Sequence, residues 1–272
     1  MNLSKVKLVV SDMDGTLLNS KGEVSKLFFD LFKKLQKHHI HFCAASGRQY
    51  SSIVHKLDPI RENITIIAEN GGIVKQQDNI LLLNKLAPKK ITEIIPILRT
   101  IKDTYIVLCG KDTAYIETTN KKFISMFEEY YTTFKIVPDL TKVISDTDFL
   151  KIAIYHFKSS EKHIYPKIEY LKNKYLLKIS GKNWLDISDV RANKGNALRA
   201  VQKKLNITKE ETMVFGDYHN DLEMLQEANF SFAMKNAHKD IKKKANYGTE
   251  SNDNFGVERI LEKLIEARET TL

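Results

Sequence analysis

The chain has 272 residues, of which 42% are hydrophobic and 28% are charged, so it can form a substantial core in one large domain or two modest ones. Its 43 Lys and Arg residues against 34 Asp and Glu give a formal net charge of +9, which favours anionic ligands. The basic residues are scattered and no recognisable nucleic-acid module is present, so we expect no nucleic-acid partner.

The ends and the cysteines of the chain bear on its location. No apolar run is long enough to span a bilayer, and the first residues lack the pattern of a signal peptide. Only Cys43 and Cys109 are available, which argues against a disulfide framework and fits a reducing compartment. We therefore expect a soluble, cytoplasmic protein without a membrane partner.

The first third of the chain alternates strands and helices. An apolar strand is predicted at Lys7–Ser11, and a helix capped by Ser25 extends to about His39 because its apolar residues recur at helical spacing. Further strands are predicted at Ile40–Ala45 and Thr65–Ala68, a helix at Tyr50–Leu57, and a hairpin at Ile73–Lys75 and Ile80–Leu83. This alternation predicts βαβ units and therefore a parallel sheet.

The rhythm changes between about Leu86 and Ile187. Strands are predicted at Tyr105–Cys109, Ala114–Glu117, Leu150–Phe157, Tyr175–Ser180 and Trp184–Ile187, with helices at Ile91–Ile101, Lys121–Tyr131 and Glu161–Lys172. The stretch from Val137 to Asp148 has no pattern that predicts its structure. Strands and helices mixed in this way indicate an α+β domain inserted into an α/β one.

The α/β rhythm then resumes. Helices are predicted at Gly195–Lys204, Asp221–Ala228 and Val257–Arg268, and strands at Met213–Phe215 and Phe230–Met234. We therefore divide the chain into a first core segment, residues 1–85, an inserted domain, residues 86–187, and a second core segment, residues 188–272.

The most informative motif is LVVSDMDGTLL, in which an apolar strand leads into Asp12, Asp14 and a Gly-Thr turn. Alternation along a strand points both carboxylates to one side, and the carboxyl ends of strands in an open α/β sheet are where ligands bind. One carboxylate there can attack phosphorus while the other transfers a proton. The alternative is that the two residues simply open a turn, although the flanking sequence favours phosphoryl-transfer chemistry.

Two other predicted strands end in polar residues suited to an anion. Ser46, Gly47 and Arg48 follow the second strand, where a hydroxyl and backbone amides can bind phosphate; Ser46 could also, or instead, cap the next helix. Asn70 and Gly71 follow the third strand, where they could contact substrate or only form a hairpin turn. We treat Ser46 as a candidate catalytic residue, and Gly47, Arg48, Asn70 and Gly71 as candidates for substrate binding.

The second core segment adds a lysine and further oxygen ligands. Lys194 stands before Gly195 and a helix, where an ammonium could neutralise the charge of a carboxylate and a phosphate, although a solvated lysine is the simpler interpretation. The motif GDYHND places Asp217, Asn220 and Asp221 after another strand. Such hard oxygen donors suit Mg²⁺, whereas Asp221 alone could be an acidic first turn of a helix.

Taken in order, DMDGT, ASGR, the Lys-Gly pair and GDYHND resemble the four motifs of the haloacid dehalogenase superfamily, most closely its Cof-type (subclass IIB) phosphatases. The resemblance covers nearly the whole chain. It implies a Rossmann-like parallel-sheet core with an α+β cap domain inserted after the third core strand. It also implies Asp12 as the nucleophile, Asp14 as the general acid and base, Ser46 as a phosphate-binding hydroxyl and Lys194 as the charge-neutralising group.

The same resemblance implies a magnesium site. Asp217 would bind Mg²⁺ together with Asp12 and the carbonyl of Asp14, and Asp221 would support these ligands. Asn220 joins the substrate-binding candidates.

Several positions depart from the usual pattern of this branch. Ser46 replaces a commoner threonine and keeps the hydroxyl, while Asp189 and Arg191 stand where proline and glycine are usual, at the return from cap to core. Lys235 stands where glycine is usual. None of these changes removes a catalytic group.

We therefore expect a Mg²⁺-dependent phosphatase that acts on a small phosphorylated metabolite, with sugar phosphates as the substrate class implied by the resemblance, through an aspartyl-phosphate. The alternatives are a phosphomutase or phosphotransferase on sugar phosphates, and a catalytically weak regulatory binder of the same fold. Nothing in the sequence indicates an oligomeric state.

Overall fold

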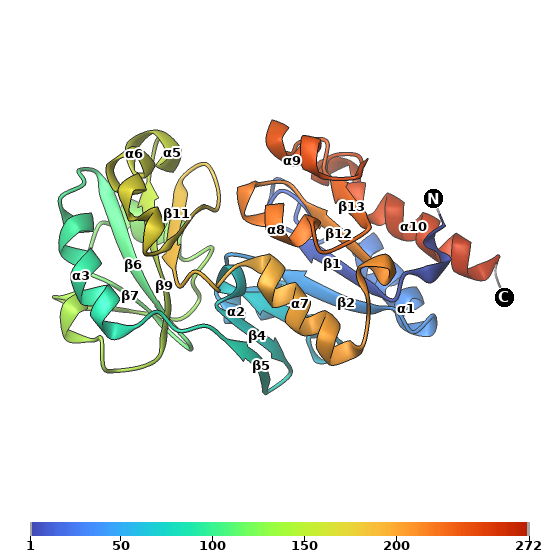
Figure 1. Cartoon of the computed structure of the whole chain (residues 1–272), viewed down its shortest axis with the longest axis horizontal. Helices are drawn as coiled ribbons and strands as arrows, with labels where there is room; N and C mark the ends of the chain where they lie inside the picture. Colours follow the sequence, from blue (N-terminus) through green and yellow to red (C-terminus); the bar gives the residue numbers. More distant parts are fainter. Residues whose placement is uncertain (1, 271–272) are drawn as a thin grey trace.

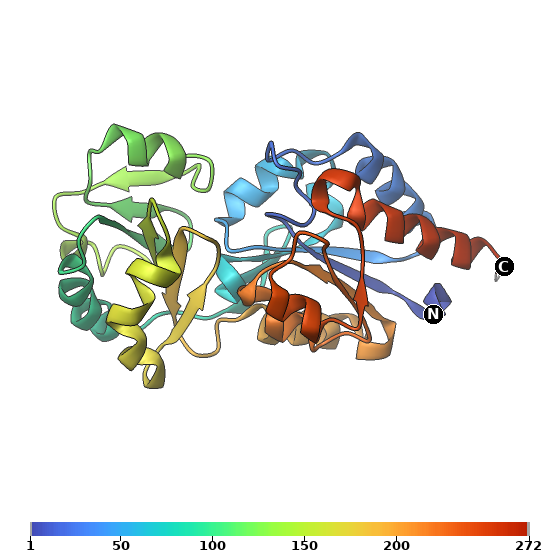
Figure 2. The ribbon, with the colours of Figure 1, turned by 90° about the horizontal axis from the view of Figure 1, so that it is seen from above.

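The computed structural model describes residues 2–270, whose strands form two sheets (Figures 1 and 2). The larger sheet has eight strands in the order β14-β13-β12-β1-β2-β3-β4-β5, and the smaller has six in the order β10-β11-β9-β6-β7-β8. Neighbours from β14 to β3 are parallel, and β4 and β5 add an antiparallel edge. In the smaller sheet only β7 and β8 are parallel.

The larger sheet comes from both ends of the chain. Its strands are β1 (Leu8–Asp12), β2 (His41–Ala45), β3 (Thr65–Ala68), β4 (Ile73–Gln76), β5 (Asn79–Leu83), β12 (Thr212–Gly216), β13 (Phe230–Ala233) and β14 (Tyr247–Gly248). Its helices are α1 (Lys26–Lys37), α2 (Tyr50–Lys56), α7 (Lys194–Leu205), α8 (Leu222–Leu225), α9 (Lys239–Lys244) and α10 (Gly256–Glu269). The predicted alternation of strands and helices is confirmed here.

The smaller sheet comes from the middle of the chain. Its strands are β6 (Thr104–Gly110), β7 (Ala114–Ile116), β8 (Phe134–Ile136), β9 (Phe149–His156), β10 (Leu176–Ile179) and β11 (Trp184–Ser188), accompanied by α3 (Pro88–Arg99), α4 (Lys121–Phe127), α5 (Ser160–His163) and α6 (Tyr165–Ile168). Two buried clusters pack on it, one that includes Ile91 and Ile95 of α3 and one that includes Phe123 and Phe127 of α4.

Local chemistry explains the elements around β1. Every residue of β1 is buried, as expected for a central strand of a parallel sheet covered on both faces. The hydroxyl of Ser25 accepts a hydrogen bond from the backbone N–H of Phe28, so Ser25 caps α1 as predicted. The buried side of α1 consists of Phe28, Leu31, Phe32 and Leu35, which recur at the helical spacing that predicted this helix.

Some predicted elements are wrong in extent. The single helix expected at Glu161–Lys172 is broken into α5, α6 and a 3-10 segment at Glu169–Asn173, because Pro166 has no N–H for a continuous helical ladder. The helix expected to reach Tyr131 ends at Phe127, and the one expected at Asp221–Ala228 is only α8 with a preceding 3-10 turn, His219–Asp221. The sequence also failed to predict β8, β14 and α9.

The predicted fold class, an α/β chain with a Rossmann-like parallel core, is confirmed. Both cysteines, Cys43 and Cys109, are buried and free. Among residues 2–270, none of the helices combines the length and the apolar character that a membrane span requires.

Candidate active site

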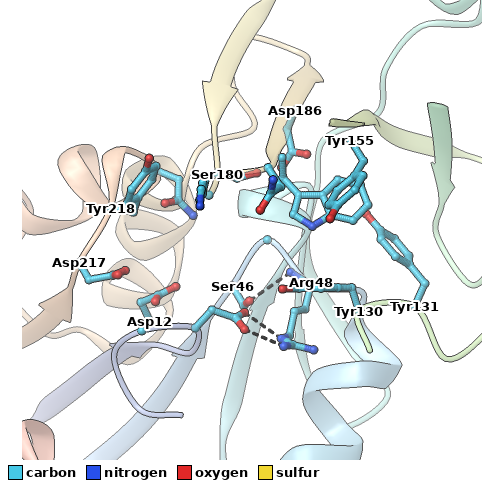
Figure 3. A pocket seen from close by; sticks show the side chains of 18 of the residues that line it. Asp12, Ser46, Arg48, Tyr130, Tyr131, Tyr155, Ser180, Asp186, Asp217 and Tyr218 are labelled. Atoms are coloured by element: carbon cyan, nitrogen blue, oxygen red, sulfur yellow. Dashed lines mark hydrogen bonds and ion pairs between the residues drawn. The ribbon is translucent and has the colours of Figure 1, made fainter. Parts of the chain in front are cut away.

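A cavity of about 460 Å³ lies between the two sheets. Residues after β1, β2 and β12 line one side of it, and residues of β9 and β11 line the other. Figure 3 shows Asp12 and Asp217 at one end and Tyr130, Tyr131 and Tyr155 at the opposite end. The cavity therefore lies at the carboxyl ends of the parallel strands, where an open α/β sheet binds its ligands.

Asp12, the last residue of β1, is paired with a buried lysine. Lys194 is the first residue of α7, which Asn193 caps, and its Nζ donates to Asp12 Oδ1 at 2.5 Å and to Asp221 Oδ1 at 2.7 Å. The Lys194 side chain is fully buried. Burial by itself would lower the pKa of this ammonium, but the carboxylates of Asp12 and Asp221 outweigh that effect and raise the pKa of Lys194.

Three carboxylates gather around this lysine. Oxygen atoms of Asp12, Asp217 and Asp221 lie within 4.8 Å of one another. Burial, and next the negative charge of Asp221, raise the pKa of Asp12 to about 7. Burial and the charge of Asp12 likewise raise the pKa of Asp217 well above its ordinary value. One ammonium faces three carboxylates, so the cluster holds more negative than positive charge when it is ionised.

The members of the cluster differ in what they can still bind. Asp221 Oδ2 accepts the backbone N–H groups of Asp217 at 2.9 Å and Tyr218 at 3.2 Å, so both of its oxygens are already engaged. Asp12 Oδ2 and the Asp217 carboxylate make no hydrogen bond within residues 2–270. Gly15, with φ +75°, approaches the Asp217 carboxylate so closely that a side chain at position 15 would collide with it.

Asp14 and Arg48 form a pair at the edge of the cavity. Arg48 Nε and Nη2 donate to the two oxygens of Asp14 at 2.8 and 2.6 Å, in a bidentate ion pair. Arg48 also reaches the middle segment of the chain, because it donates to the Glu129 carbonyl and lies 4.4 Å from the ring centroid of Tyr130. The guanidinium thus orients Asp14 and touches both halves of the cavity.

The loop after β2 presents its polar atoms to the cavity. Ser46 Oγ accepts the backbone N–H of Arg48 at 3.1 Å, and Ser46 and Gly47 both line the cavity. The residue that caps α2 is Gln49, so Ser46 does not cap this helix. The helix-cap interpretation of Ser46 is therefore wrong. Its side chain belongs to the loop after β2 that lines the cavity.

A hydrogen bond joins Asn70, in the turn after β3, to Asn220, in the turn after β12. Asn220 Nδ2 donates to Asn70 Oδ1 at 3.0 Å, and Asn70 Nδ2 donates to Asp186 Oδ2 at 2.5 Å. Asn70 and Gly71 adopt positive φ, +54° and +90°, in a 3-10 turn before β4. The turn predicted between β3 and β4 is present. Asn70 also links this turn to Asn220 and Asp186.

Sequence reasoning missed the group at the centre of this network. Lys151, in the middle of β9, is 2% exposed, and its Nζ lies 2.7 Å from the Gly47 carbonyl, 2.9 Å from Asp186 Oδ2 and 3.0 Å from Glu69 Oε2. Burial raises the pKa of Glu69 to about 6 although Lys151 opposes the shift. A lysine inside the apolar run LKIAIYHF is the signal that could have identified this position.

The other missed feature is an aromatic wall, which we define as Met126, Tyr130, Tyr131, Tyr155 and Trp184. The ring centroid of Trp184 lies 4.9 Å from that of Tyr155 and 5.7 Å from that of Tyr130. These side chains come from α4, the turn after it, β9 and β11.

Comparison with known proteins agrees with this geometry. Residues 9–261 match the family described as haloacid dehalogenase-like hydrolase. The Escherichia coli (strain K12) protein named 5-amino-6-(5-phospho-D-ribitylamino)uracil phosphatase YbjI is 28% identical over 267 residues, which cover 96% of each chain. Phosphatase YwpJ of Bacillus subtilis (strain 168) is 26% identical over 287 residues, covering 96% of this chain and all of that one.

A solved structure agrees in fold over the same extent. The crystal structure of SMU.1108c from Streptococcus mutans UA159 superposes with a TM-score of 0.89 and 29% identity, covering 96% of this chain and 99% of that one. The family match spans nearly all of the chain, and it confirms the resemblance seen in the motifs. The chain belongs to the haloacid dehalogenase-like hydrolase family.

Proposed function

We propose that this hydrolase is a Mg²⁺-dependent phosphatase of small phosphorylated metabolites, with sugar phosphates as its substrate class. The observation that carries the proposal is the buried pair of Asp12 and Lys194 at the carboxyl end of β1, in which Asp12 lines the cavity. A carboxylate held in this way can attack phosphorus while the ammonium balances the charge that the phosphate brings. Relatives named phosphatase support the same conclusion.

In the first step, an oxygen of Asp12 attacks phosphorus, and the bond from phosphorus to the ester oxygen breaks. Asp14 gives a proton to the departing oxygen. In the second step, water attacks the phosphorus of the aspartyl-phosphate, Asp14 takes the proton of that water, and Asp12 is released with inorganic phosphate. The bidentate pair with Arg48 holds Asp14 in its ionised form, which is the form that takes the proton of the water. To give a proton to the departing oxygen, Asp14 is protonated on an oxygen that has left this pair.

The phosphate would be held by the loop after β2 and by Lys194. The Ser46 hydroxyl and the backbone of Gly47 line the cavity close to Asp12, where they can bind phosphate oxygens. The links from Asn70 to Asn220 and to Asp186 hold two loops and β11 around that position. We assign these residues, with Gly71 and Arg48, to binding and positioning of the substrate.

The residues present fit a bound Mg²⁺. The excess of carboxylates over ammonium calls for a cation, and hard oxygen atoms are the donors that Mg²⁺ prefers. Asp12 and Asp217, with free carboxylate oxygens, would hold the ion together with the Asp14 carbonyl, and Asp221 would position the Asp217 backbone. When bound, the ion would neutralise charge on the phosphoryl oxygens.

We further propose that residues 86–187 act as a cap on a core made of residues 1–85 and 188–272. All strands of the smaller sheet lie between Thr104 and Ser188, and they provide one side of the cavity. A cap of this kind excludes water and selects the leaving group. Two buried free cysteines fit a reducing compartment, and the proposal places the enzyme in the cytoplasm.

The test is phosphate release from sugar phosphates, nucleotides, flavin mononucleotide and pyridoxal phosphate, with and without Mg²⁺. The Asp12→Asn variant, checked for folding by circular dichroism, provides the blank. We expect release that requires Mg²⁺ and disappears in the variant. Equal release by the variant, or none by folded wild-type protein across the panel, would refute the proposal; an isomerised sugar phosphate would identify a mutase instead.

A further inference from the structure

Two histidines from different loops lie against each other beside the turn that follows β12. His219 is the first residue of the 3-10 turn His219–Asp221, and His238 immediately precedes α9. Their ring centroids are 4.3 Å apart, and Asp240 Oδ2 lies 3.5 Å from His238 Nδ1. One ligand atom from each of these three side chains lies within 4.8 Å of the other two. The cluster therefore presents two imidazoles and one carboxylate to a common point.

Helix capping explains only part of this arrangement. His238 Nδ1 accepts the backbone N–H of Asp240 at 3.3 Å, so this ring caps α9. His219 belongs to the other loop, and among residues 2–270 no hydrogen bond engages its ring. All three side chains are partly exposed, so an ion can reach them from solvent. The ring nitrogens of His219 are free to bind it.

The donor atoms favour a transition-metal ion over Mg²⁺. Imidazole nitrogen suits Zn²⁺, Cu²⁺ and Ni²⁺, whereas Mg²⁺ prefers oxygen. Two histidines and one carboxylate form a known set of ligands for Zn²⁺, with a further position left to water. At bond lengths of about 2.1 Å, the ligand atoms of a tetrahedral ion lie about 3.4 Å apart. His238 and Asp240 already have this separation, and rotation of the His219 side chain can bring its nitrogen to the same ion.

The backbone holds both histidines in place through Asp217. His219 follows Asp217 by two residues, and the backbone N–H of His238 donates to the Asp217 carbonyl at 2.9 Å. Between these histidines in sequence and space, the ring of Tyr218 has its centroid 5.1 Å from that of His219 and 5.9 Å from that of His238. The Asp217 carboxylate faces Asp12, so this one residue belongs to the acidic cluster by its side chain and supports the histidine cluster by its carbonyl.

We infer that His219, His238 and Asp240 form a second metal site, which binds a transition-metal ion such as Zn²⁺. This site is separate from the carboxylate site that we assign to Mg²⁺. An ion bound there would join the turn after β12 to the start of α9 and so restrain the loop that carries Asp217. The inference goes beyond the proposed function and does not depend on it, because the site can bind its ion whether or not the chain hydrolyses phosphate esters.

Metal binding by the untagged protein tests the inference. Calorimetric titration with Zn²⁺ in excess Mg²⁺ measures binding while Mg²⁺ competes for the carboxylate site. Cu²⁺ is the spectroscopic probe, because its electron paramagnetic resonance spectrum reports the nitrogen atoms bound to it. The test variants are His219→Gln and His238→Gln.

Two control variants distinguish this site from the other places where an ion could bind. Asp217→Asn weakens the carboxylate site and keeps the carbonyl that anchors His238. His163→Gln removes one ring of another histidine pair, His156 and His163 of the middle segment, whose ring centroids are also 4.3 Å apart. Circular dichroism shows that each variant is folded.

We expect the wild type and both controls to bind one Zn²⁺ in excess Mg²⁺ and to give a Cu²⁺ spectrum with two imidazole nitrogens. His219→Gln and His238→Gln should each weaken Zn²⁺ binding by about a hundredfold or more, because a ligand matters more than an outer partner, whose loss costs about 10- to 100-fold. Zn²⁺ should also raise the unfolding midpoint of the wild type but not that of His238→Gln.

No binding of Zn²⁺ by the wild type in excess Mg²⁺ would overturn the inference, as would undiminished binding by either His219→Gln or His238→Gln. Loss of binding in Asp217→Asn would locate the ion at the carboxylate site, and loss in His163→Gln would locate it at the histidine pair of the middle segment. Either of these results would overturn the inference as well.

Discussion

Two lysines, one in each half of the molecule, have the same electrostatic surroundings. Lys194 is buried between Asp12 and Asp221 at the end of the larger sheet, and Lys151 is buried between Glu69 and Asp186 on the smaller one. In both places the surrounding carboxylates keep a buried ammonium charged. Their other neighbours differ, and we infer from this difference that Lys194 takes part in the reaction whereas Lys151 holds the two sheets in position.

The neighbours of Lys194 include Asp12, whose second oxygen is open to the cavity. The third neighbour of Lys151 is the Gly47 carbonyl, so this lysine ties β9 to the loop that contains Ser46. A buried ion pair contributes to catalysis only where a reacting atom can reach one of its members. We therefore expect loss of Lys194 to act mainly on turnover and loss of Lys151 to act mainly on the association of the two sheets.

The largest effect is expected for Lys194→Met. Without the ammonium, the carboxylates of Asp12, Asp217 and Asp221 repel one another and the phosphate loses a cation. We expect kcat to fall about a thousandfold or more, as when a charge-stabilising donor is removed from an active site. Measured phosphate release decides the matter, and a loss of less than about tenfold would contradict the role we assign to Lys194.

Lys151→Met should lower the free energy of unfolding by about 3–5 kcal/mol, because it leaves two carboxylates buried without a cation. Urea unfolding measures the loss, and Lys102→Met, which removes an exposed lysine, serves as the matched control with little change. If the two variants unfolded alike, the network around Lys151 would not hold the sheets together.

Arg48→Lys keeps the charge but cannot bind both oxygens of Asp14 at once. We expect kcat/KM to fall by about ten- to a hundredfold with little change in unfolding midpoint, because the positioning of the proton-transfer group is lost. Steady-state kinetics beside thermal unfolding separate the two effects. Unchanged kinetics would show that Asp14 does not need this partner.

The smallest effect concerns Glu69. Burial raises the pKa of its carboxyl group from 4.5 to about 6. The folded chain therefore binds this proton more tightly than the unfolded chain, and the resulting stability is present below pH 4.5 and lost as the pH rises through about 6. We expect the free energy of unfolding of the wild type, measured relative to that of Glu69→Gln, to fall by about 2 kcal/mol as the pH rises through this window. The figure follows from about 1.4 kcal/mol per pKa unit. Urea unfolding at several pH values measures it, and a flat difference would contradict the shift.

Most of the core could be read from the sequence because its signals are local. The strand before Asp12, the cap at Ser25 and the helix after Lys194 each depend on neighbouring residues, and periodicity shows them directly. The middle segment was harder to predict. Its apolar periodicity indicates one continuous helix, which Pro166 interrupts in the structure. Short edge strands such as β8 and β14 have too few residues to show a pattern.

The sequence by itself determined the family, the parallel core and the polar motifs that follow its strands, because each motif is contiguous and parallel strands bring their ends to one edge. Only the tertiary structure decided that Arg48 grips Asp14, that Lys151 reaches the Gly47 carbonyl and that Tyr155 and Trp184 form one wall. Those contacts join residues far apart in the chain. They depend on how the two sheets face each other, which no local pattern of residues records.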